Sequence, residues 1–370
     1  MKTRAAILWE VGKDWSVEEI ELDPPKKGEV LVRMVGSGLC HSDEHLLTGD
    51  LPFGLPIIGG HEGAGVVEQV GEGVDWLAEG DHVVFGFVPA CGRCPSCATG
   101  HENLCDLGMY QADGRQISDH TARHHSSDGT DLGLMCLLGT FSERTVVNEA
   151  SCIKIDQDIP LERACLLGCG VVTGWGSAVY AAGVRPGDDV AVVGIGGIGI
   201  NAVQGAKLAG ARRIFAIDPL EFKRNKAIEF GATHTADNLE NALQHIQEVT
   251  YGRMCNKVIM TMGVGSGDAV GQALAITAKL GKVVVTNIHP ALENQFAVSG
   301  FDLTVMEKSI QGSLFGSANP RVDIPKLLEL WRDGQLKLDE VVTRTYPLDG
   351  VNQGYEDMRE GVNLRGVLTF

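Results

Sequence analysis

The amino-acid sequence predicts an α/β protein of two domains: a mostly-β first part and a second part built on a doubly wound parallel sheet. Its 370 residues are long for one domain and comfortable for two, and 44% of them are hydrophobic, which supplies a sizeable core. Glycine and proline often interrupt the first 160 residues, as is typical of short strands joined by turns. Beyond Gly168, short apolar runs alternate with helical patterns, which indicates parallel strands with helices on both faces.

In the first part, strands are predicted at 30–35 and 65–70, where apolar and β-branched residues follow one another between turn residues. The stretch 115–130 is polar and rich in histidine. It is predicted to be a solvated surface loop.

In the second part, short apolar runs at 190–193, 213–218, 257–262 and 281–286 predict buried parallel strands. Helices are predicted between them at 199–208, 221–230 and 268–279. After Pro320 the pattern changes to a helix at 325–331 and an extended segment at 341–347. This tail is too short to fold alone, so we expect it to pack back on another domain.

The formal net charge of −17 bears on the expected partners. An acidic surface repels phosphate backbones and anionic lipids, so neither a nucleic acid nor a membrane is an expected partner. The first residues are charged and contain no apolar signal segment. The uncharged run 164–184 is long enough to span a bilayer, but its many glycines are unlike a membrane helix. We therefore expect a soluble, cytoplasmic protein.

The hexapeptide Gly194-Ile195-Gly196-Gly197-Ile198-Gly199 is a G-x-G-x-x-G motif that follows a predicted strand and opens a predicted helix. Its glycines allow a tight turn and a close backbone approach, and the helix N-terminus presents N–H groups to a pyrophosphate. Asp218 ends the next predicted strand, nineteen residues after Gly199. A carboxylate there accepts hydrogen bonds from both ribose hydroxyls and repels a 2′-phosphate, which favours NAD over NADP. Lys223 lies close enough in sequence to reach the ribose or a phosphate.

Four of the ten cysteines, Cys91, Cys94, Cys97 and Cys105, fall within fifteen residues. In a long chain without a secretion signal, such clustering indicates a metal site and not a disulfide framework. Four thiolates complete the coordination of a tetrahedral zinc ion, so a site of this kind is structural. An iron–sulfur cluster also uses four cysteines, and the neighbouring charges do not decide between the two.

Three further groups of metal-ligating residues are scattered along the chain: Cys40 within G-L-C-H-S-D-E-H, His61 within G-G-H-E-G, and Cys169 within G-C-G. Spacing alone does not connect them, and a lone histidine or cysteine is more often structural. Together they match what a catalytic zinc ion needs, because two thiolates and one imidazole leave a fourth position open for water or an alkoxide. Zinc lowers the pKa of a bound alcohol, and hydride then leaves the alkoxide carbon for a nicotinamide.

These motifs resemble those of the zinc-containing medium-chain dehydrogenases/reductases of the alcohol dehydrogenase type, and the resemblance covers essentially the whole chain. It rests on G-H-E at 60–62, the four-cysteine lobe, G-C-G at 168–170, T-G-x-G at 173–176 and G-x-G-G-x-G at 194–199. The resemblance implies a GroES-like catalytic domain over 1–170 and 315–370, with a structural zinc lobe at 91–105. It implies a Rossmann NAD-binding domain over 171–314.

The resemblance also implies a role for each matching residue. Cys40, His61 and Cys169 would bind a catalytic zinc ion, and Cys91, Cys94, Cys97 and Cys105 a structural one. Glu62 would lie behind the catalytic metal, and Asp43 would orient the zinc-bound histidine. Ser42 would take the alcohol proton, and His45 would be the surface base that passes it to solvent through the cofactor ribose. Thr173, Ile198 and Arg365 would contact the nicotinamide or the pyrophosphate.

One position departs from the family pattern. Many liver-type members carry an arginine directly after the first catalytic cysteine, where it binds a cofactor phosphate, but this chain has His41. A neutral histidine gives up that permanent charge contact, so cofactor release need not follow the liver-type behaviour.

A narrower resemblance, to the mycofactocin-associated alcohol dehydrogenases, is carried by M-K-T-R-A-A at 1–6, M-C-L-L-G-T-F-S-E at 135–143 and E-F-K-R at 221–224. Those enzymes are nicotinoproteins: they hold NAD(H) without exchanging it and pass electrons to a separate acceptor, or to a nitrosoaniline dye in assays. The two resemblances together imply one catalytic and one structural Zn²⁺ per chain, bound NAD(H), a small alcohol substrate and a mycofactocin-like acceptor. A homo-oligomer is expected, since family members form dimers and tetramers.

Three alternatives stay open. An ordinary dehydrogenase exchanges its NAD with solution, and one branch of that group oxidises formaldehyde as a glutathione adduct. A formaldehyde dismutase also retains its cofactor. A structural zinc protein of the same fold is the non-enzyme alternative, and the presence of all three catalytic ligands together with Ser42 and His45 argues against it.

Overall fold

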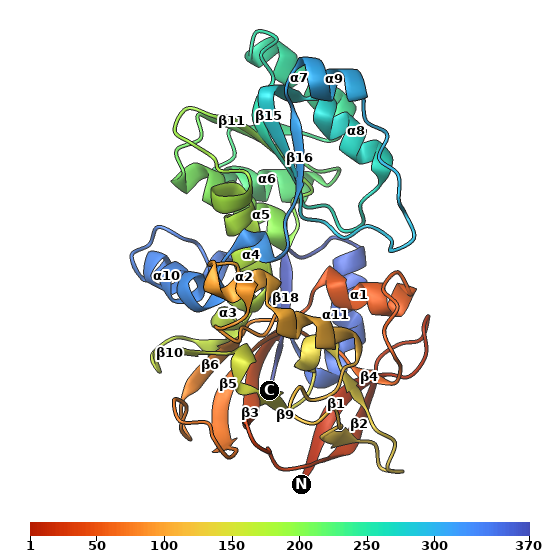
Figure 1. Ribbon diagram of the computed structural model, residues 1–370. Helices are drawn as coiled ribbons and strands as arrows, with labels where there is room; N and C mark the ends of the chain where they lie inside the picture. Colours follow the sequence, from red (N-terminus) through yellow and green to blue (C-terminus); the bar gives the residue numbers. More distant parts are fainter. The chain divides into compact units, whose positions relative to one another are not determined.

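The computed structural model describes residues 1–370, which form two compact units (Figure 1). The first comprises Met1–Cys169, Asn319–Glu329 and Leu338–Phe370, and the second comprises Gly170–Ala318 and Leu330–Lys337. The family resemblance placed 1–170 and 315–370 in the first domain, but Gly170, residues 315–318 and Leu330–Lys337 lie with the second unit. Two hydrogen bonds tie Leu330–Lys337 to the second unit: the Lys337 N–H donates to Gln204 Oε1 at 2.8 Å, and the Lys337 carbonyl accepts from Gln204 Nε2 at 3.0 Å.

The first unit contains two sheets. One has the order β7 (His124–His125), β2 (Ser16–Leu22), β1 (Lys2–Leu8), β4 (Ile57–Ile58) and β8 (Gly133–Leu134). The other has the order β10 (Cys152–Ile155), β6 (His82–Phe85), β5 (Glu62–Val70), β3 (Glu29–Gly38), β18 (Arg365–Thr369) and β17 (Val342–Pro347), and β9 (Arg144–Asn148) also pairs with β3. The predicted strands at 30–35 and 65–70 are confirmed within β3 and β5. Strand β2 was missed because only Ile20 and Leu22 among its residues are buried, so its apolar alternation is short.

Short helices complete the first unit: α1 (His41–Thr48), α2 (Pro95–Ala98), α3 (Leu161–Ala164), α10 (Pro320–Arg332, of which the last three residues belong to the second unit) and α11 (Val351–Arg359). The Trp15 ring joins α11 to the rest of the core, since it lies 5.6 Å from the Phe141 ring and 6.2 Å from the Tyr355 ring. Strand β18 pairs antiparallel with β3, with Val367 opposite Gly38. The C-terminal tail therefore completes a sheet that begins near the N-terminus, which confirms the prediction that it packs back on another part of the chain.

The segment 115–130 differs from the predicted solvated loop. Part of it forms β7, which pairs with the end of β2 and so carries Arg123 and His124 into the interior, where they are 1% and 0% exposed. Arg123 donates from Nε to Glu29 Oε2 at 2.9 Å and from Nη2 to Glu29 Oε1 at 2.8 Å. Burial lowers the pKa of His124 to about 3, and the neighbouring charges of His125 and Arg123 act in the same direction. The surface-loop prediction is thus wrong for Arg123 and His124, because polar residues can be buried when they are paired.

The second unit is built on one sheet of six parallel strands. Its strands are β11 (Asp189–Val193), β12 (Arg213–Ile217), β13 (His234–Ala236), β14 (Cys255–Met260), β15 (Thr277–Val285) and β16 (Ser309–Gly312), in the order β13-β12-β11-β14-β15-β16. Numbered from β11, this order is 3-2-1-4-5-6, in which the winding direction reverses between β11 and β14. The doubly wound parallel sheet predicted from the sequence is confirmed. Ligands of such sheets bind outside the carboxyl ends of the strands at this reversal.

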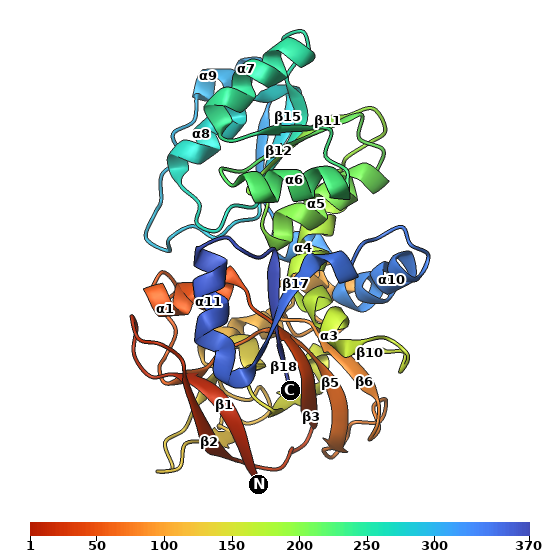
Figure 2. The same ribbon diagram turned by 180° about the vertical axis from the view of Figure 1, so that it is seen from behind.

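Helices cover both faces of this sheet: α5 (Gly197–Leu208) and α6 (Glu221–Phe230) contact each other, as do α7 (Leu239–Val249) and α8 (Gly267–Ala275), and the two pairs lie on opposite sides (Figure 2). The predicted helices at 199–208 and 221–230 are confirmed. The predicted helix 268–279 is shorter than expected, since α8 ends at Ala275 and β15 begins at Thr277. The short α9 (Gly300–Val305) precedes β16.

The glycines in the uncharged run 164–184 allow close packing between helices. The run contains α4 (Gly170–Gly176), which continues as a π-helical turn over Ser177–Ala181. A Cβ atom on Gly174 would lie 2.0 Å from the Ile198 carbonyl oxygen, so α4 and α5 approach backbone to backbone. By length and hydropathy no single helix qualifies as a membrane span, and only the bent pair Leu161–Gly168 and Gly170–Ala181, taken together, meets those criteria.

The burial of His124 predicts a loss of stability in acid. Its folded-state pKa of about 3 lies below the ordinary value of 6.5, so the unfolded chain binds more protons between these values and the free energy of unfolding falls as the pH drops through that window. His124→Asn removes the titrating group and should flatten this part of the pH dependence, as measured by chemical denaturation. His120→Asn, at an exposed histidine, is the control and should leave the slope unchanged. A His124→Asn curve parallel to that of the parent protein would contradict the prediction.

Candidate active site

Four metal-ligating side chains converge in the first unit. The Sγ atoms of Cys40 and Cys169, a ring nitrogen of His61 and a carboxylate oxygen of Glu62 all lie within 4.8 Å of one another, and all four residues are buried. Cys40 directly precedes α1, His61 and Glu62 lie at the start of β5, and Cys169 follows a 3-10 turn. Because β3 pairs with β5 through Gly38 opposite Glu62, the end of β3 brings Cys40 beside His61. Three segments that are distant in sequence therefore meet in one cluster.

The glycines that flank these residues are required by space. A Cβ atom on Gly38 would lie 2.0 Å from Glu62 Oε2, and one on Gly168 would lie 2.5 Å from the Phe85 carbonyl oxygen. Gly60 adopts φ +87°, a left-handed conformation that glycine tolerates best, and a Cβ atom there would lie 2.4 Å from the Phe141 ring. The G-H-E and G-C-G motifs thus reflect close backbone packing around the cluster.

Asp43 lies beside the Nδ1 atom of the His61 ring. Its Oδ2 atom is 3.0 Å from His61 Nδ1, and its Oδ1 atom accepts a hydrogen bond from the Gly60 N–H at 2.7 Å. Both side chains are almost fully buried. Burial alone would lower the pKa of His61, but the charges of Asp43 and Cys40 outweigh it and raise that pKa well above its usual value. The contact leaves His61 Nε2 as the ring atom that can bind a metal ion.

Glu62 forms a buried ion pair with Arg365, whose Nη2 contacts Glu62 Oε2. Burial raises the pKa of Glu62 to about 7, against the lowering effect of the arginine. Arg365 is the first residue of β18, and the pairing of β18 with β3 brings it next to Glu62. The family resemblance assigned Arg365 to the cofactor, and in the first unit its contact is with Glu62.

The other predicted catalytic residues lie on α1. Ser42 Oγ is 3.7 Å from Cys40 Sγ, which puts this hydroxyl beside the ligand cluster. The His41 and His45 rings are 6.3 Å apart, one turn along the same helix. His45 is 2% exposed, so the surface position implied by the family resemblance is wrong: the ring contacts His41 and Asp50. Its Nδ1 atom lies 3.1 Å from Asp50 Oδ2.

Two neighbours of this site were not identified from the sequence. Asp50 is one, and its only signal was its place five residues after His45. Phe87 is the other: its ring meets the His61 ring edge-on, with 5.9 Å between the centroids. Cys136 is also buried close enough to His61, Asp43 and Cys40 for their charges to act on it, and burial raises its pKa to about 12.

The four clustered cysteines also converge. The Sγ atoms of Cys91, Cys94, Cys97 and Cys105 lie within 4.8 Å of one another, with 4.0 Å between Cys91 and Cys97 and 3.9 Å between Cys94 and Cys105. A single tetrahedral ion with Zn–S bonds of about 2.3 Å requires sulfur atoms about 3.8 Å apart. The geometry therefore fits one four-coordinate ion.

Backbone N–H groups support thiolates in this lobe. The N–H groups of Arg93 and Cys94 donate to Cys91 Sγ at 3.4 and 3.2 Å. Hydrogen bonds from the backbone of Asp106 and then Cys97 lower the pKa of Cys94 to about 6. Burial raises the pKa of Cys97 to about 12. Metal binding would still give a Cys97 thiolate, since a metal ion deprotonates its thiol ligands.

In the second unit, the G-x-G-x-x-G motif forms the turn between β11 and α5, at the carboxyl end of β11. Gly194 has φ +91°, and a Cβ atom on Gly199 would lie 1.9 Å from the Gly194 carbonyl oxygen. Around Gly196, in contrast, a Cβ atom would meet nothing within 4 Å. Gly197 and Ile198 form the first turn of α5. The motif thus occupies the structural context that dinucleotide binding requires.

Asp218 follows β12 directly and is 5% exposed. Its Oδ2 atom accepts from the Ile195 N–H at 2.7 Å, and its Oδ1 atom accepts from the Leu220 N–H at 2.9 Å. The carboxylate is therefore held against the glycine-rich turn. Lys223 is half-buried in the first turn of α6, and Thr173 is buried in α4.

Known proteins share both parts of this architecture. A family profile described as alcohol dehydrogenase GroES-like domain matches residues 26–157, and one described as zinc-binding dehydrogenase matches residues 197–333. The chain is 51% identical to alcohol dehydrogenase B of Mycobacterium tuberculosis, with 100% of this chain and 99% of the relative covered. It is 50% identical to the NDMA-dependent alcohol dehydrogenase of Amycolatopsis methanolica, again with 100% and 99% covered. The chain belongs to the zinc-dependent medium-chain alcohol dehydrogenases.

Solved structures agree with this assignment. A zinc-binding-domain alcohol dehydrogenase protein from Burkholderia ambifaria superposes with a TM-score of 0.93 at 32% identity, covering 100% of this chain and 99% of that chain. Benzyl alcohol dehydrogenase from Acinetobacter calcoaceticus superposes with a TM-score of 0.89 at 30% identity, with the same coverage. The predicted fold class, a GroES-like domain plus a Rossmann-type domain, is confirmed for this alcohol dehydrogenase.

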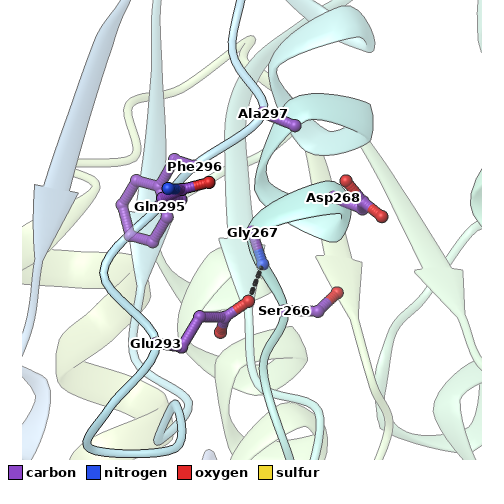
Figure 3. Close-up of a pocket in the computed structure, with 7 residues that line it drawn as sticks. All are labelled: Ser266, Gly267, Asp268, Glu293, Gln295, Phe296 and Ala297. Carbon is purple, nitrogen blue, oxygen red and sulfur yellow. Dashed lines mark hydrogen bonds between the residues drawn. The ribbon is translucent and has the colours of Figure 1, made fainter.

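A separate hollow of about 240 Å³ in the dehydrogenase's second unit lies at the start of α8 (Figure 3). Its lining is Ser266, Gly267, Asp268, Glu293, Gln295, Phe296 and Ala297. Glu293 Oε1 already accepts the Gly267 N–H at 2.8 Å, and Ser266 caps the helix by accepting from the Ala269 N–H. The protein's own side chains thus satisfy this helix N-terminus.

The glycine-rich turn of this dehydrogenase predicts two separable effects. Gly199→Ala forces a Cβ atom onto the Gly194 carbonyl and should lower the thermal stability and abolish NAD(H) binding. Gly196→Ala meets no protein atom, so it should leave the stability unchanged yet weaken NAD(H) binding at least tenfold, because the second glycine of the motif lets the pyrophosphate approach the backbone. Differential scanning fluorimetry and cofactor titration of the stripped protein measure the two quantities. Undiminished NAD(H) affinity in Gly196→Ala would exclude this turn as the pyrophosphate site.

Proposed function

We propose that this alcohol dehydrogenase oxidises a small alcohol to an aldehyde or ketone by hydride transfer to an NAD that stays bound between turnovers. An external acceptor, such as mycofactocin, then reoxidises the NADH. The observation that carries the proposal is the buried convergence of Cys40, His61 and Cys169. Two thiolates and an imidazole can hold zinc and leave a fourth position for the substrate. The 50% identity to an NDMA-dependent alcohol dehydrogenase supports the retained cofactor.

A zinc ion held by Cys40, His61 and Cys169 would supply Lewis acidity, which would lower the pKa of an alcohol hydroxyl so that it ionises near neutral pH. Cys40 and Cys169 contribute the negative charge that holds the cation. Asp43, 3.0 Å from His61 Nδ1, fixes the imidazole with Nε2 toward the cluster. Glu62 remains close by, restrained by Arg365. In this proposal the shape of the cluster is set before any substrate arrives.

Residues of α1 provide the route for the proton. Ser42 Oγ, next to Cys40 Sγ, would take the hydroxyl proton of the alcohol and donate its own proton onward. His45 would receive that proton by way of the cofactor ribose and release it to solvent. The balanced reaction is alcohol plus NAD⁺ giving carbonyl compound, NADH and one proton. The hydride leaves the same carbon whose hydroxyl loses the proton.

The second unit holds the cofactor in this proposal. The N–H groups at the start of α5 would bind the pyrophosphate, together with the turn formed by Gly194, Gly196, Gly197, Ile198 and Gly199. Asp218 accepts the ribose hydroxyls, because a carboxylate has about four lone-pair positions and the N–H groups of Ile195 and Leu220 use only two. Lys223 contacts the ribose or a phosphate. His41, Thr173 and Arg365 complete the predicted contacts.

We assign one catalytic and one structural zinc ion to each chain. The sulfur distances of 3.9 and 4.0 Å in the four-cysteine lobe support the structural ion, and a lobe with four protein ligands has no open position for a substrate. We further propose that the protein is a cytoplasmic homo-oligomer, a dimer or tetramer, without nucleic-acid or membrane partners.

Ordinary NAD-exchanging dehydrogenases and formaldehyde dismutases are the competing assignments. Turnover with free NAD, with or without a glutathione adduct of formaldehyde, would favour the first. Equimolar formate and methanol from formaldehyde alone would favour the second. Neither outcome requires an external acceptor, which the proposed function does.

Metal content should respond separately at the two sites. Cys97→Ser is expected to remove about one equivalent of zinc per chain and to lower the melting temperature, because the lobe depends on its metal. Cys169→Ser should also remove about one equivalent and abolish turnover, with a smaller change in melting temperature. Elemental analysis by mass spectrometry and thermal unfolding give both readouts. Cys255→Ala, at a buried thiol outside both clusters, is the control and should keep both metal ions. Full zinc content in Cys97→Ser would exclude the structural site.

Retention of the cofactor has a direct test. The purified protein, after extensive dialysis, should release about one equivalent of NAD(H) per chain on denaturation, and it should oxidise alcohols with NDMA but without added NAD. Asp218→Ala should lose that retained cofactor, since the ribose contact is removed. A cofactor-free preparation that turns over only with added NAD would refute retention and leave an ordinary alcohol dehydrogenase.

A further inference from the structure

Asp50 follows the helix that carries the proposed proton route. Helix α1 ends at Thr48, and Gly49 terminates it with φ +78°, so the chain turns back on itself. The turn brings Asp50 Oδ2 to 3.1 Å from His45 Nδ1. His45 is 2% exposed, and its other ring nitrogen, Nε2, is buried without a hydrogen-bond partner in the protein.

We propose that Asp50 is a positioning residue for His45: its carboxylate accepts the Nδ1–H, which fixes the ring orientation and the tautomer that keeps Nε2 as a proton acceptor. A neutral imidazole carries its proton on one nitrogen only, and a partner for that nitrogen decides which. With Nδ1–H directed at Asp50, the lone pair lies on Nε2. Asp50 thus gives His45 the support that the buried carboxylate of a catalytic triad gives its histidine. This inference rests on the proposed function of His45.

The carboxylate is itself held in place. Thr48 Oγ1 donates to Asp50 Oδ2 at 2.6 Å, the same oxygen that faces His45. The hydrogen bond from Thr48 and then that from His45 lower the pKa of Asp50, so the acceptor is ionised at neutral pH. The Leu51 N–H also donates to the His45 carbonyl at 3.3 Å, which ties the turn back to the helix.

The other charged groups around α1 are engaged elsewhere. Asp43 faces His61, and Glu44 accepts two hydrogen bonds from Arg359. The His41 ring lies edge-on to His45 at 6.3 Å between centroids, too far for a hydrogen bond between them. Asp50 is therefore the carboxylate that the geometry assigns to His45.

The test compares single turnovers of the holoenzyme, with its retained NAD⁺ and a saturating alcohol, across a set of variants. Asp50→Ala and His45→Ala should each slow NADH formation by about 10²-fold, the lower end for loss of a general base, while the alcohol concentration at half-maximal rate changes little. Added imidazole should restore much of the rate in both, since it offers a base that needs no positioning. Asp50→Asn, whose amide oxygen can still accept Nδ1–H, should fall between wild type and Asp50→Ala. Asp349→Ala, at an exposed carboxylate paired with Arg4, is the matched control and should behave as wild type.

The outcomes distinguish the role of Asp50 from the proposed function of His45. A slow, imidazole-rescued His45→Ala beside a wild-type Asp50→Ala would overturn the role of Asp50 and leave the proposed function standing. A slow Asp50→Ala that imidazole does not rescue would indicate a structural effect and would also overturn it. Wild-type rates in His45→Ala would remove the proton route itself, and the inference with it. Asp50→Asn keeps the test decisive if Asp50→Ala does not fold.

Discussion

The register between β3 and β5 is the constraint on which the candidate active site depends. Gly38 stands opposite Glu62, and this pairing sets Cys40, two residues beyond Gly38, beside His61. Strand β18 continues the same sheet on the other side of β3 and supplies Arg365 to Glu62. A shift of one residue in this ladder would turn these side chains to the opposite face. The metal-ligating cluster therefore depends on a sheet assembled from both ends of the chain, and no single loop creates it.

Glycine is the means by which the backbone approaches so closely. Neighbouring atoms leave no room for a Cβ atom at Gly38, Gly60 and Gly168 around the metal-ligating cluster, or at Gly199 in the glycine-rich turn. Gly196 differs, because the protein leaves the space beside it open. The same residue type thus serves internal packing at most of these positions, and at Gly196 it leaves room for a ligand.

In the first unit, each of several predicted site residues is contacted by a second polar side chain. Asp43 contacts His61 and Arg365 contacts Glu62, and all four side chains are buried. Asp50 contacts the buried His45 from a partly exposed position. Burial makes such pairs costly to break and holds their geometry, since an unpaired partner would be left without solvent. The four-cysteine lobe uses backbone N–H groups for the same purpose. Orientation of each functional group by a second one is what makes the cluster suited to the chemistry proposed for it.

The sequence alone determined the parallel sheet, the glycine-rich turn and the four-cysteine lobe, because each of these is a local pattern of spacing and periodicity. It linked Cys40, His61 and Cys169 only through a family resemblance, since residues joined by strand pairing leave no mark in their spacing. Tertiary structure decided the burial of Arg123 and His124, which composition had placed in solvent, because β7 adds to a sheet edge that local sequence does not reveal. It also decided that Leu330–Lys337 lies with the second unit, because Lys337 pairs with the distant Gln204. The contact of Asp50 with His45 has a local cause, the turn at Gly49, but which side chain meets the ring depends on the folded geometry of that turn.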